Sequence, residues 1–584
     1  MICNPFGYEA LCAHQTLRAF AEMAAELGIP ALMFDYLGTG DSDDAAVGTD
    51  QFESWVRDTD AAVRALCSAA GVRQVCVLGL RIGATAAATA AARCPWITRL
   101  IALAPVTSGR RYLREMRTMR LAATAHSLSA KQPTMSKSER DDPSQGFEVG
   151  GFYIEPATIR SLSTVDVADL PAGNVRDVLI VDRPELPTAR GWTDAMSKLG
   201  IRVTYSALPG FEQVIQTEPQ LAVVPGAMIS AARGWLQAAL QSTAEPVSSA
   251  ANTGSIPSAA TSETLSIANG TGVACSERPL FVDEDRRIFA ILTEPLAAGR
   301  SGRGVLLLND GATHHIGSSR MAVRLARRWA QMGYAVLRMD LAGLGDSAPH
   351  AGRIGTNAYP PGAMADVAVT ASFMRRQLSV SHLTVSGLCS GAYHALQAAA
   401  CGLPVNQVLA VNPLIFYWQP EGLSEQEVKT VEAIHNTQRY RRHALSRATL
   451  MKILTGHVNL RRLVGLVGNR MALWTPGLAR KQSQTEAPTA AAEDRNARDL
   501  RRRMRDFDLG KQLAAVASRA VRLHFIFSRG ESGLDILQML AESSLQRLAA
   551  TCRIYQIDGA DHIFSQSEPR ARLEELLSEI LKPS

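Results

Sequence analysis

The sequence lacks the features that define several large classes of protein. Its nine cysteines form no C-x-x-C pair and no zinc-knuckle spacing, which argues against a disulfide framework and against structural zinc. No run of about 18 apolar residues is present, so no membrane-spanning helix is predicted. The opening MICNPFGYEA has no basic segment followed by an apolar core, unlike a secretory signal. Together these absences predict a cytoplasmic protein.

An excess of charge of one sign is also missing. The formal net charge is +6 over 584 residues and the basic side chains are scattered, so nucleic acid is not an expected partner. Hydrophobic residues make up 46% of the chain, enough for large buried cores. The length corresponds to two or three domains. The oligomeric state is left open by these data.

One low-complexity segment divides the chain. Residues 243–276 are rich in Ser, Ala, Thr and Gly, contain few large apolar residues and show no amphipathic period. Such a composition is typical of a flexible linker. We therefore predict one domain over 1–242 and a second over 277–584.

The two parts resemble each other. The segments that begin at Asn4 and Asn309 align without a gap: each has a loop, an amphipathic helix, a glycine stop, a buried strand (ALMFD or AVLRMD) and a turn ending in G-D-S. Further on, VCVLGLRIGATAA matches LTVSGLCSGAYHA. The order of matches indicates a duplicated or fused pair. Short apolar strands alternate with helical patterns, which predicts α/β domains with doubly wound, mostly parallel sheets.

The segment LTVSGLCSGAYHALQAAA contains the strongest candidate for catalysis. A buried strand, a Gly387-x-Cys389-x-Gly391 turn and an Ala-rich helix form the context of a nucleophile elbow. The glycines permit the sharp turn. A thiol at the start of a helix is favoured as thiolate, its reactive form. The alternative is a tight structural turn with a core cysteine.

Oxyanion donors are expected on both sides of this turn. The backbone N–H of Ser390 is one candidate, and the loop after VLLLNDGATHH offers the other near Gly311 or Ala312. The Ser390 side chain lies one position past the apex and is a poor substitute for the nucleophile.

A general base and an orienting acid follow later in the sequence. His562 comes after the last strand, in CRIYQIDGADHIFS, where a loop histidine can reach the elbow. Glu531 lies just beyond the preceding strand and is the first choice for the acid; Asp535 is the alternative. The chain order of nucleophile, acid and histidine is the one expected for this type of fold.

These motifs resemble the α/β-hydrolase superfamily, in particular its serine-aminopeptidase-like and lipase-like branch. The resemblance implies two α/β-hydrolase-type domains in tandem, the second with a helical cap inserted at 415–515. The family normally has serine where Cys389 stands, but cysteine occurs in dienelactone hydrolases and polyhydroxyalkanoate synthases. Nucleophilic chemistry therefore stays possible, and acyl transfer becomes possible too. The apolar residues that open the cap either line an acyl pocket or pack the cap onto the core: Ile415, Phe416, Tyr417 and Trp418.

Other histidines are weaker candidates. His314 and His315 follow the expected oxyanion loop and are candidates to line the site, but the sequence places no carboxylate near them, so no metal is expected. His394, one turn into the helix after the elbow, is expected to pack. No cofactor is predicted.

The first domain has lost two of the three triad positions. Arg81 stands at the nucleophile position and Gln213 at the histidine position, while Glu185 keeps the acid. Arginine stays protonated and cannot attack a carbonyl, so this domain is predicted to be catalytically silent. Arg81 either binds an anion at the helix N-terminus or pairs with Glu185 or another acid. The first domain also lacks the segment ERPLFVDEDRRIFAILTEPL, an apparent hairpin ahead of the second domain, so it has shed its edge strands or the true start lies upstream.

Three functions fit this sequence. In the first, Cys389 attacks a small-molecule acyl ester or thioester and water releases the acid. In the second, the same residues transfer the acyl group to another acceptor. In the third, both domains are non-catalytic binding or scaffold modules, because the first domain tolerates loss of the triad.

Overall fold

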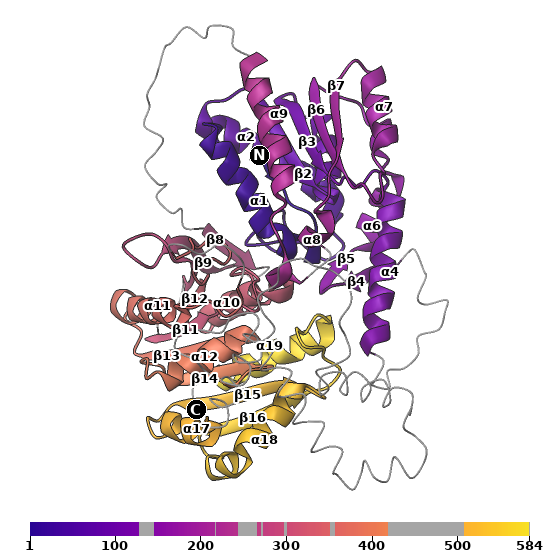
Figure 1. Cartoon of the computed structure of the whole chain (residues 1–584). Coiled ribbons are helices and arrows are strands. Elements are labelled where there is room, and N and C mark those ends of the chain that lie inside the picture. Colours follow the sequence, from indigo (N-terminus) through magenta and orange to yellow (C-terminus); the bar gives the residue numbers. More distant parts are fainter. Residues whose placement is uncertain are drawn as a thin grey trace, which may run out of the picture.

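The computed structural model describes residues 1–127, 145–215, 218–242, 265–269, 272–296, 301–350, 357–417 and 507–582. The chain forms two α/β domains, drawn one above the other in Figure 1, the first in indigo to magenta and the second in salmon to yellow. Most of the predicted cap, residues 418–506, lies outside the described residues. Among the described helices, none is long and apolar enough to cross a membrane.

The first domain is a five-stranded parallel sheet between two helical layers. The strand order is β1-β2-β3-β6-β7: Ile2–Cys3, Val75–Leu80, Ile97–Leu103, Asp177–Asp182 and Arg202–Ala207. Buried side chains of α1 (Tyr8–Glu26), α8 (Phe211–Ile215) and α9 (Gly226–Ser242) pack on one face. The other face carries α2 (Gln51–Ala70), α3 (Ile82–Ala91), α4 (Gly109–Ser127), α6 (Pro156–Thr164) and α7 (Arg190–Lys198).

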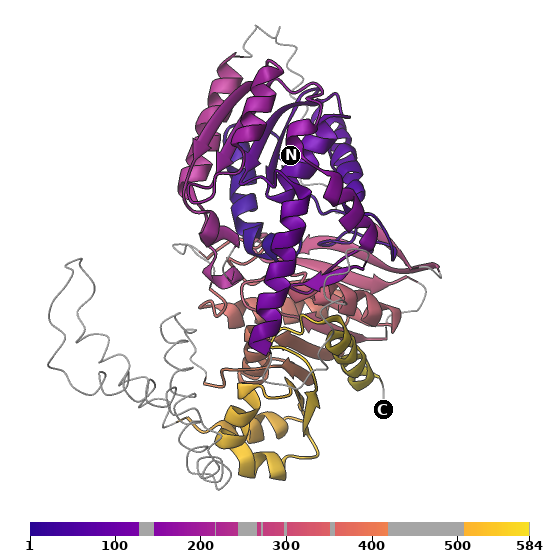
Figure 2. The same ribbon diagram turned by 90° about the vertical axis from the view of Figure 1, so that its right-hand side faces the viewer.

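A short hairpin and two 3-10 turns complete this domain. The strands β4 (Phe147–Val149) and β5 (Phe152–Ile154) form a separate antiparallel hairpin. The 3-10 turns η1 (Val167–Asp169) and η2 (Pro219–Leu221) follow α6 and α8. The side view in Figure 2 shows α4 extending from the first domain down along the second.

The second domain has a nine-stranded sheet in the order β16-β15-β14-β13-β11-β12-β10-β9-β8. Strands β8 to β10 are antiparallel and the other pairs are parallel, except that β12 joins β10 antiparallel. In chain order, from β8 to β16, the strands span Leu265–Asn269, Gly272–Phe281, Phe289–Pro295, Arg303–Leu307, Ala335–Met339, His382–Leu388, Gln407–Val411, Arg522–Ser528 and Cys552–Ile557. The predicted hairpin is thus present as β9–β10.

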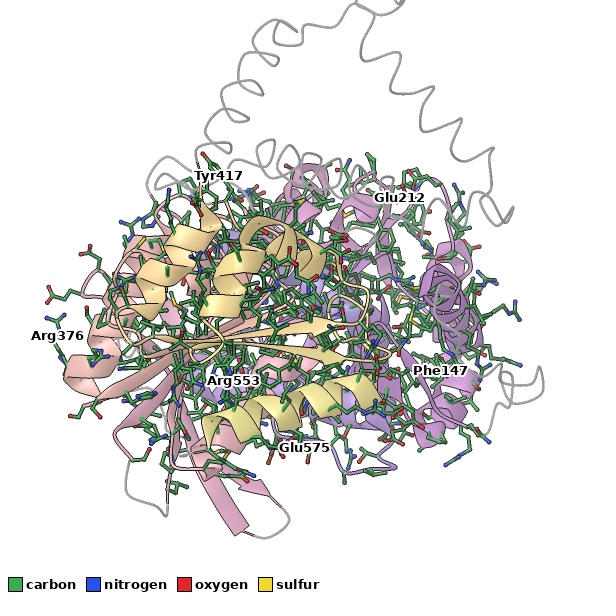
Figure 3. The ribbon with its side chains drawn as sticks, turned by 90° about the horizontal axis from the view of Figure 1, so that it is seen from below. Phe147, Glu212, Arg376, Tyr417, Arg553 and Glu575 are labelled. Atoms are coloured by element: carbon green, nitrogen blue, oxygen red, sulfur yellow. The ribbon has the colours of Figure 1, made fainter. Side chains whose placement is uncertain are left out.

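Helices cover both faces of this sheet too. The turn η3 (Ser318–Arg320) leads into α10 (Met321–Gln331), which packs on one face with α19 (Ser567–Leu581). The other face carries α11 (Ala363–Gln377), α12 (Ser390–Ala400), α17 (Leu509–Ala517) and α18 (Ser532–Arg547). Figure 3 shows this layering from below, with Glu575 of α19 on one side of the strand that carries Arg553 and Tyr417 on the other. The prediction of two doubly wound, mostly parallel sheets is confirmed.

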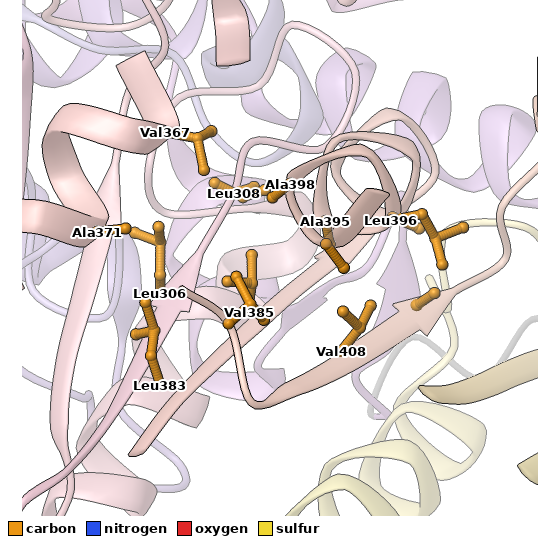
Figure 4. Close-up of a cluster of buried hydrophobic side chains, with 14 of the residues drawn as sticks. Leu306, Leu308, Val367, Ala371, Leu383, Val385, Ala395, Leu396, Ala398 and Val408 are labelled. Atoms are coloured by element: carbon orange, nitrogen blue, oxygen red, sulfur yellow. The ribbon is translucent and has the colours of Figure 1, made fainter. Parts of the chain in front are cut away.

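The core of the second domain lies under the helix that follows the elbow. Figure 4 shows Val385 and Val408 of neighbouring strands meeting Ala395 and Ala398 of α12. Small alanine side chains let α12 approach the sheet closely, so its first turn is held firmly at the carboxyl end of β13.

Two predictions about boundaries are wrong. The segment ALMFD of the first domain is not a buried strand, because Met33 makes a single bridge to Ile2 and its neighbours are partly exposed. Its counterpart β12 is paired on both sides, by β10 and β11, whereas Met33 is bridged on one side, by Ile2, among the described residues. The predicted linker 243–276 also ends too late, since β8 and the start of β9 pair with each other within it.

The G-D-S turns have the same construction in both domains. Asp35 and Asp340 each accept a hydrogen bond from the amide of the turn aspartate, Asp41 at 3.0 Å and Asp346 at 2.9 Å. The following serine hydroxyl donates back to the backbone carbonyl of Asp35 or Asp340 at 2.7 Å. The G-D-S pattern therefore forms the same turn in both domains, and each turn presents an aspartate side chain.

The two domains contact each other at these turns, where a histidine of each domain lies close to the turn aspartate of the other. His14 of α1 lies 3.1 Å from Asp346 of the second domain, and His315 of the second domain lies 2.7 Å from Asp41 of the first. His315 also lies 2.7 Å from Asp340, so each of its ring nitrogens faces a carboxylate. Burial lowers the pKa of His315, but Asp340 and Asp41 outweigh burial and hold it well above the ordinary 6.5. His315 is therefore an imidazolium that joins the domains.

We predict that the stability of the domain contact falls as the pH rises above 6.5. A histidine whose folded pKa is raised contributes its full stabilisation below the unfolded pKa and loses it as the pH passes the folded value. His315→Gln should flatten the decline of the thermal unfolding midpoint with pH. His394→Gln is the matched control, because burial lowers the pKa of His394 to about 4 and keeps it neutral in this range. An unchanged slope in His315→Gln would contradict this account.

Candidate active site

Cys389 stands at a strained corner between β13 and α12. Its backbone has φ 55° and ψ −112°, a conformation that residues other than glycine rarely adopt. A Cβ on Gly387 would lie 2.3 Å from the Gly391 carbonyl carbon, and a Cβ on Gly391 would lie 2.6 Å from the Asn309 carbonyl oxygen. Glycine at both positions is therefore required for the helix to start this close to the sheet.

His562 and Glu531 come together at the same edge of the sheet. The Nδ1 atom of His562 lies 3.1 Å from Oε2 of Glu531, which caps the N-terminus of α18. The other ring nitrogen, Nε2, is buried and has no hydrogen-bond partner of standard geometry among the described residues. Burial lowers the pKa of His562, but its interactions with Cys389 and then Glu531 raise it well above 6.5. The thiol therefore acts on the ionisation of the imidazole, and catalytic hydrogen bonds of unliganded sites are often longer than those of the bound state.

The geometry distinguishes between the two candidate acids. Glu531 holds the histidine directly and is itself fixed by the Ser532 amide at 3.1 Å. Burial raises the pKa of Glu531, but the hydrogen bond and charge of His562, together with hydrogen bonds from Ser532 and Ser528, lower this pKa below the usual 4.5. Asp535 lies one turn further along α18.

Asn412, which the sequence analysis did not single out, fixes the histidine loop. Its Nδ2 donates to the backbone carbonyl of His562 at 2.7 Å, and its Oδ1 accepts from the Ser528 amide at 2.8 Å. Asn412 has a positive φ of 44° directly after β14. A polar residue just past a buried strand was the only signal of this role.

The oxyanion loop differs in part from the prediction. The Gly311 amide donates to the Ser390 hydroxyl at 2.9 Å, so this amide is already engaged. Ser390 begins α12, where the first amides have no acceptor within the helix. The backbone amides of Ser390 and Ala312 are therefore the better candidates for oxyanion donors, and the Ser390 side chain stabilises the loop.

Asp310 is a further buried carboxyl of this loop that was not predicted. One of its oxygens accepts from the Ser318 amide at 2.8 Å, and the other, Oδ1, is buried with no hydrogen-bond partner among the described residues. Burial raises its pKa to about 6, and His562 is among the groups that act on it. Its ionisation adds a negative charge near the imidazole above that pH.

The first domain repeats the corner with an arginine at its apex. Arg81 has φ 54° and ψ −122°, close to the values at Cys389. Its guanidinium lies 3.0 Å from Glu9 and 2.6 Å from Glu115. Glu185 is exposed, so the acid that pairs with Arg81 comes from other elements. Two carboxylates already neutralise Arg81, which favours the ion-pair alternative over an anion site.

A comparison with known families matches part of the first domain. Residues 13–149 are similar to the family described as serine aminopeptidase, S33. No curated protein matches the sequence.

Several solved hydrolase structures are similar to about half of this chain. An α/β serine hydrolase homologue from Coxiella burnetii is 12% identical, with 55% of this chain and 97% of its own covered and a TM-score of 0.28. A dienelactone hydrolase from Anabaena variabilis is 13% identical, with 52% and 96% covered and a TM-score of 0.29. An esterase from Pyrococcus furiosus is 12% identical, with 55% and 91% covered and a TM-score of 0.29.

The other candidate histidines make different contacts. The expectation that His314 and His315 lack a nearby carboxylate is wrong. The carboxylates near them are far away in the sequence and come close only in the folded chain. His315 lies with Asp340 and Asp346 in a group whose ligand atoms are within 4.8 Å of one another, a spacing that could hold a metal ion. Both ring nitrogens of His315 are already hydrogen-bonded to carboxylates, however. His394 is buried and bonded to the Ala358 carbonyl at 3.0 Å, as expected for packing.

The start of the predicted cap packs on the core. Phe416 belongs to the main hydrophobic cluster of the second domain, and Ile415 and Tyr417 are buried beside Tyr359 and Tyr393. This favours the packing alternative for these three residues, while Trp418 lies outside the described residues.

We predict that Gly391→Ala destabilises the second domain by about 1–3 kcal/mol, because the new methyl group overlaps the Asn309 carbonyl. Gly234→Ala in α9 is the control. Its Cβ would meet nothing within 4 Å, so this change should be neutral or stabilise by about 0.5–1 kcal/mol. Thermal unfolding measures both. Equal midpoints for the two variants would refute the close approach at the corner.

Proposed function

We propose that the second domain hydrolyses a small-molecule acyl ester or thioester, with Cys389 as nucleophile, His562 as general base and Glu531 as the acid that orients it. The observation that carries this proposal is the contact of His562 Nδ1 with Glu531, together with the effect of Cys389 in raising the pKa of the same imidazole. This is the arrangement that nucleophilic catalysis by a thiol requires.

The acylation step follows from this geometry. His562 Nε2 accepts the proton of the Cys389 thiol, and the sulfur forms a bond to the substrate carbonyl carbon. The amides of Ser390 and Ala312 stabilise the oxyanion. Collapse breaks the bond to the leaving alcohol or thiol, which takes the proton from the imidazolium. The acyl group is now a thioester of Cys389.

Deacylation reverses the roles. His562 takes a proton from water as the oxygen attacks the acyl carbon, the carbon–sulfur bond breaks, and the proton returns to Cys389. Thioester substrates suit this cycle best, because the exchange of one thioester for another costs little free energy. An alcohol or amine in place of water would make the same cycle an acyl transfer, which the products distinguish.

We predict that the full chain releases acid from an acyl thioester or an activated ester, and that Cys389→Ala abolishes this turnover. Cys401→Ala is the control, because Cys401 is an exposed cysteine of the same domain. Release of free thiol and of carboxylic acid is measured together, with and without an alcohol or amine acceptor. Turnover that survives in Cys389→Ala would contradict the assignment of the nucleophile, and a wild type without turnover would favour the binding or scaffold alternative.

The acid assignment gives a second prediction. Glu531→Gln removes the carboxylate that fixes the histidine tautomer, and should lower kcat by about 10²–10⁴-fold. Asp535→Asn, a change of the same kind four residues later, should leave kcat within about threefold. The reverse order of effects would assign the acid to Asp535.

A further inference from the structure

The first domain contacts the oxyanion loop of the second. The ring of His14 stacks on that of His314 with centroids 4.0 Å apart and planes 11° apart. Asp41 holds the next residue, His315. A Cβ on Gly311 would lie 3.2 Å from the side-chain oxygen of Gln220, which comes from η2 of the first domain. The silent domain therefore reaches the loop that carries the oxyanion donors.

This loop has a strained backbone that needs support from outside. Ser319 and Arg320 follow each other with φ of 53° and 62°, in the left-handed region that side chains disfavour. The guanidinium of Arg320 donates to the Gly40 carbonyl at 2.6 Å and also bonds the Ser42 carbonyl and Asp44. All three partners belong to the G-D-S turn of the first domain. Its contacts hold the loop in this conformation.

The histidine loop is supported from the same side. Glu148 of the β4–β5 hairpin lies 3.0 Å from Arg570 and accepts from the Ser567 amide at 3.0 Å. Arg570 in turn donates to the Ser565 carbonyl at 2.7 Å, three residues after His562. Both loops that meet at Cys389 thus rest on the first domain.

We propose that the first domain is a positioning unit for the active site of the second, and that His14 and Asp41 hold the oxyanion loop in its productive shape through His314 and His315. The proposal rests on the hydrolase function stated above and gives the domain that lost its triad a role in the same reaction. His14 and Asp41 are positioning residues, since they act through the loop and not on the substrate.

The test separates two reactions of Cys389 in the full chain. Ester or thioester turnover needs the oxyanion donors, whereas alkylation by iodoacetamide displaces iodide and forms no oxyanion. His14→Ala should therefore lower kcat about tenfold or more, part of the roughly 10²–10³-fold cost of losing one donor. KM and the rate of alkylation at Cys389, followed by peptide mass spectrometry, should stay within about twofold. His14→Phe, which keeps the stacked ring, should recover most of kcat.

The control is Arg18→Ala, on the same helix. Arg18 donates to the carbonyls of Gly345 and Ser347 across the domain boundary and does not contact the oxyanion loop. This variant should keep both rates. Hydrogen exchange of the amides in 309–320, measured without substrate, should accelerate in His14→Ala and not in Arg18→Ala.

Three results would overturn the proposal: an unchanged kcat in His14→Ala, an equal loss of turnover and alkylation that reports general disruption, or unchanged exchange of the loop. A wild-type chain without Cys389-dependent turnover would instead overturn the hydrolase function itself. The exchange data then answer separately whether the first domain orders this loop.

Discussion

A corner at which a side chain other than glycine takes a positive φ organises both halves of this chain. The backbone angles at Cys389 and Arg81 agree closely, and in each domain a helix starts at the carboxyl end of a central strand. The fold therefore fixes the position of the side chain at the apex, and the identity of that residue determines its chemistry. A thiol meets the imidazole of His562, whereas a guanidinium is neutralised by Glu9 and Glu115.

The surface of the first domain that faces the second has a close counterpart in that second domain. Its G-D-S turn is built like that of the second domain, and each turn aspartate is bound by a histidine of the other domain. His315 and Arg320 of the second domain are buried at this boundary, so each needs its partner from the first domain. A buried ionic boundary between two domains favours one relative placement, and this placement brings the first domain against both catalytic loops.

The sequence predicted the elements that are local in the chain. The strand–turn–helix pattern around Cys389, the strand ends before Glu531 and His562, and the order of these residues follow from short-range periodicity and glycine placement. The partners of His315 and Arg81 could not be predicted, because Asp41 is 274 residues from His315 and Glu9 is 72 from Arg81. Asn412 and the strand lost near Met33 likewise depend on what lies beside them in the sheet. Such contacts can be identified only in the folded chain.

The central claim is that Cys389 carries the acyl group, and trapping that group tests it most directly. The full chain is mixed with an acyl thioester, quenched in acid within the first turnovers and digested, and the peptide that contains residue 389 is weighed. The account predicts an added acyl mass on Cys389 that disappears as acid is released and that forms far more slowly in His562→Gln. An acyl group on another residue, or turnover with an unmodified Cys389 peptide at every time, would contradict it.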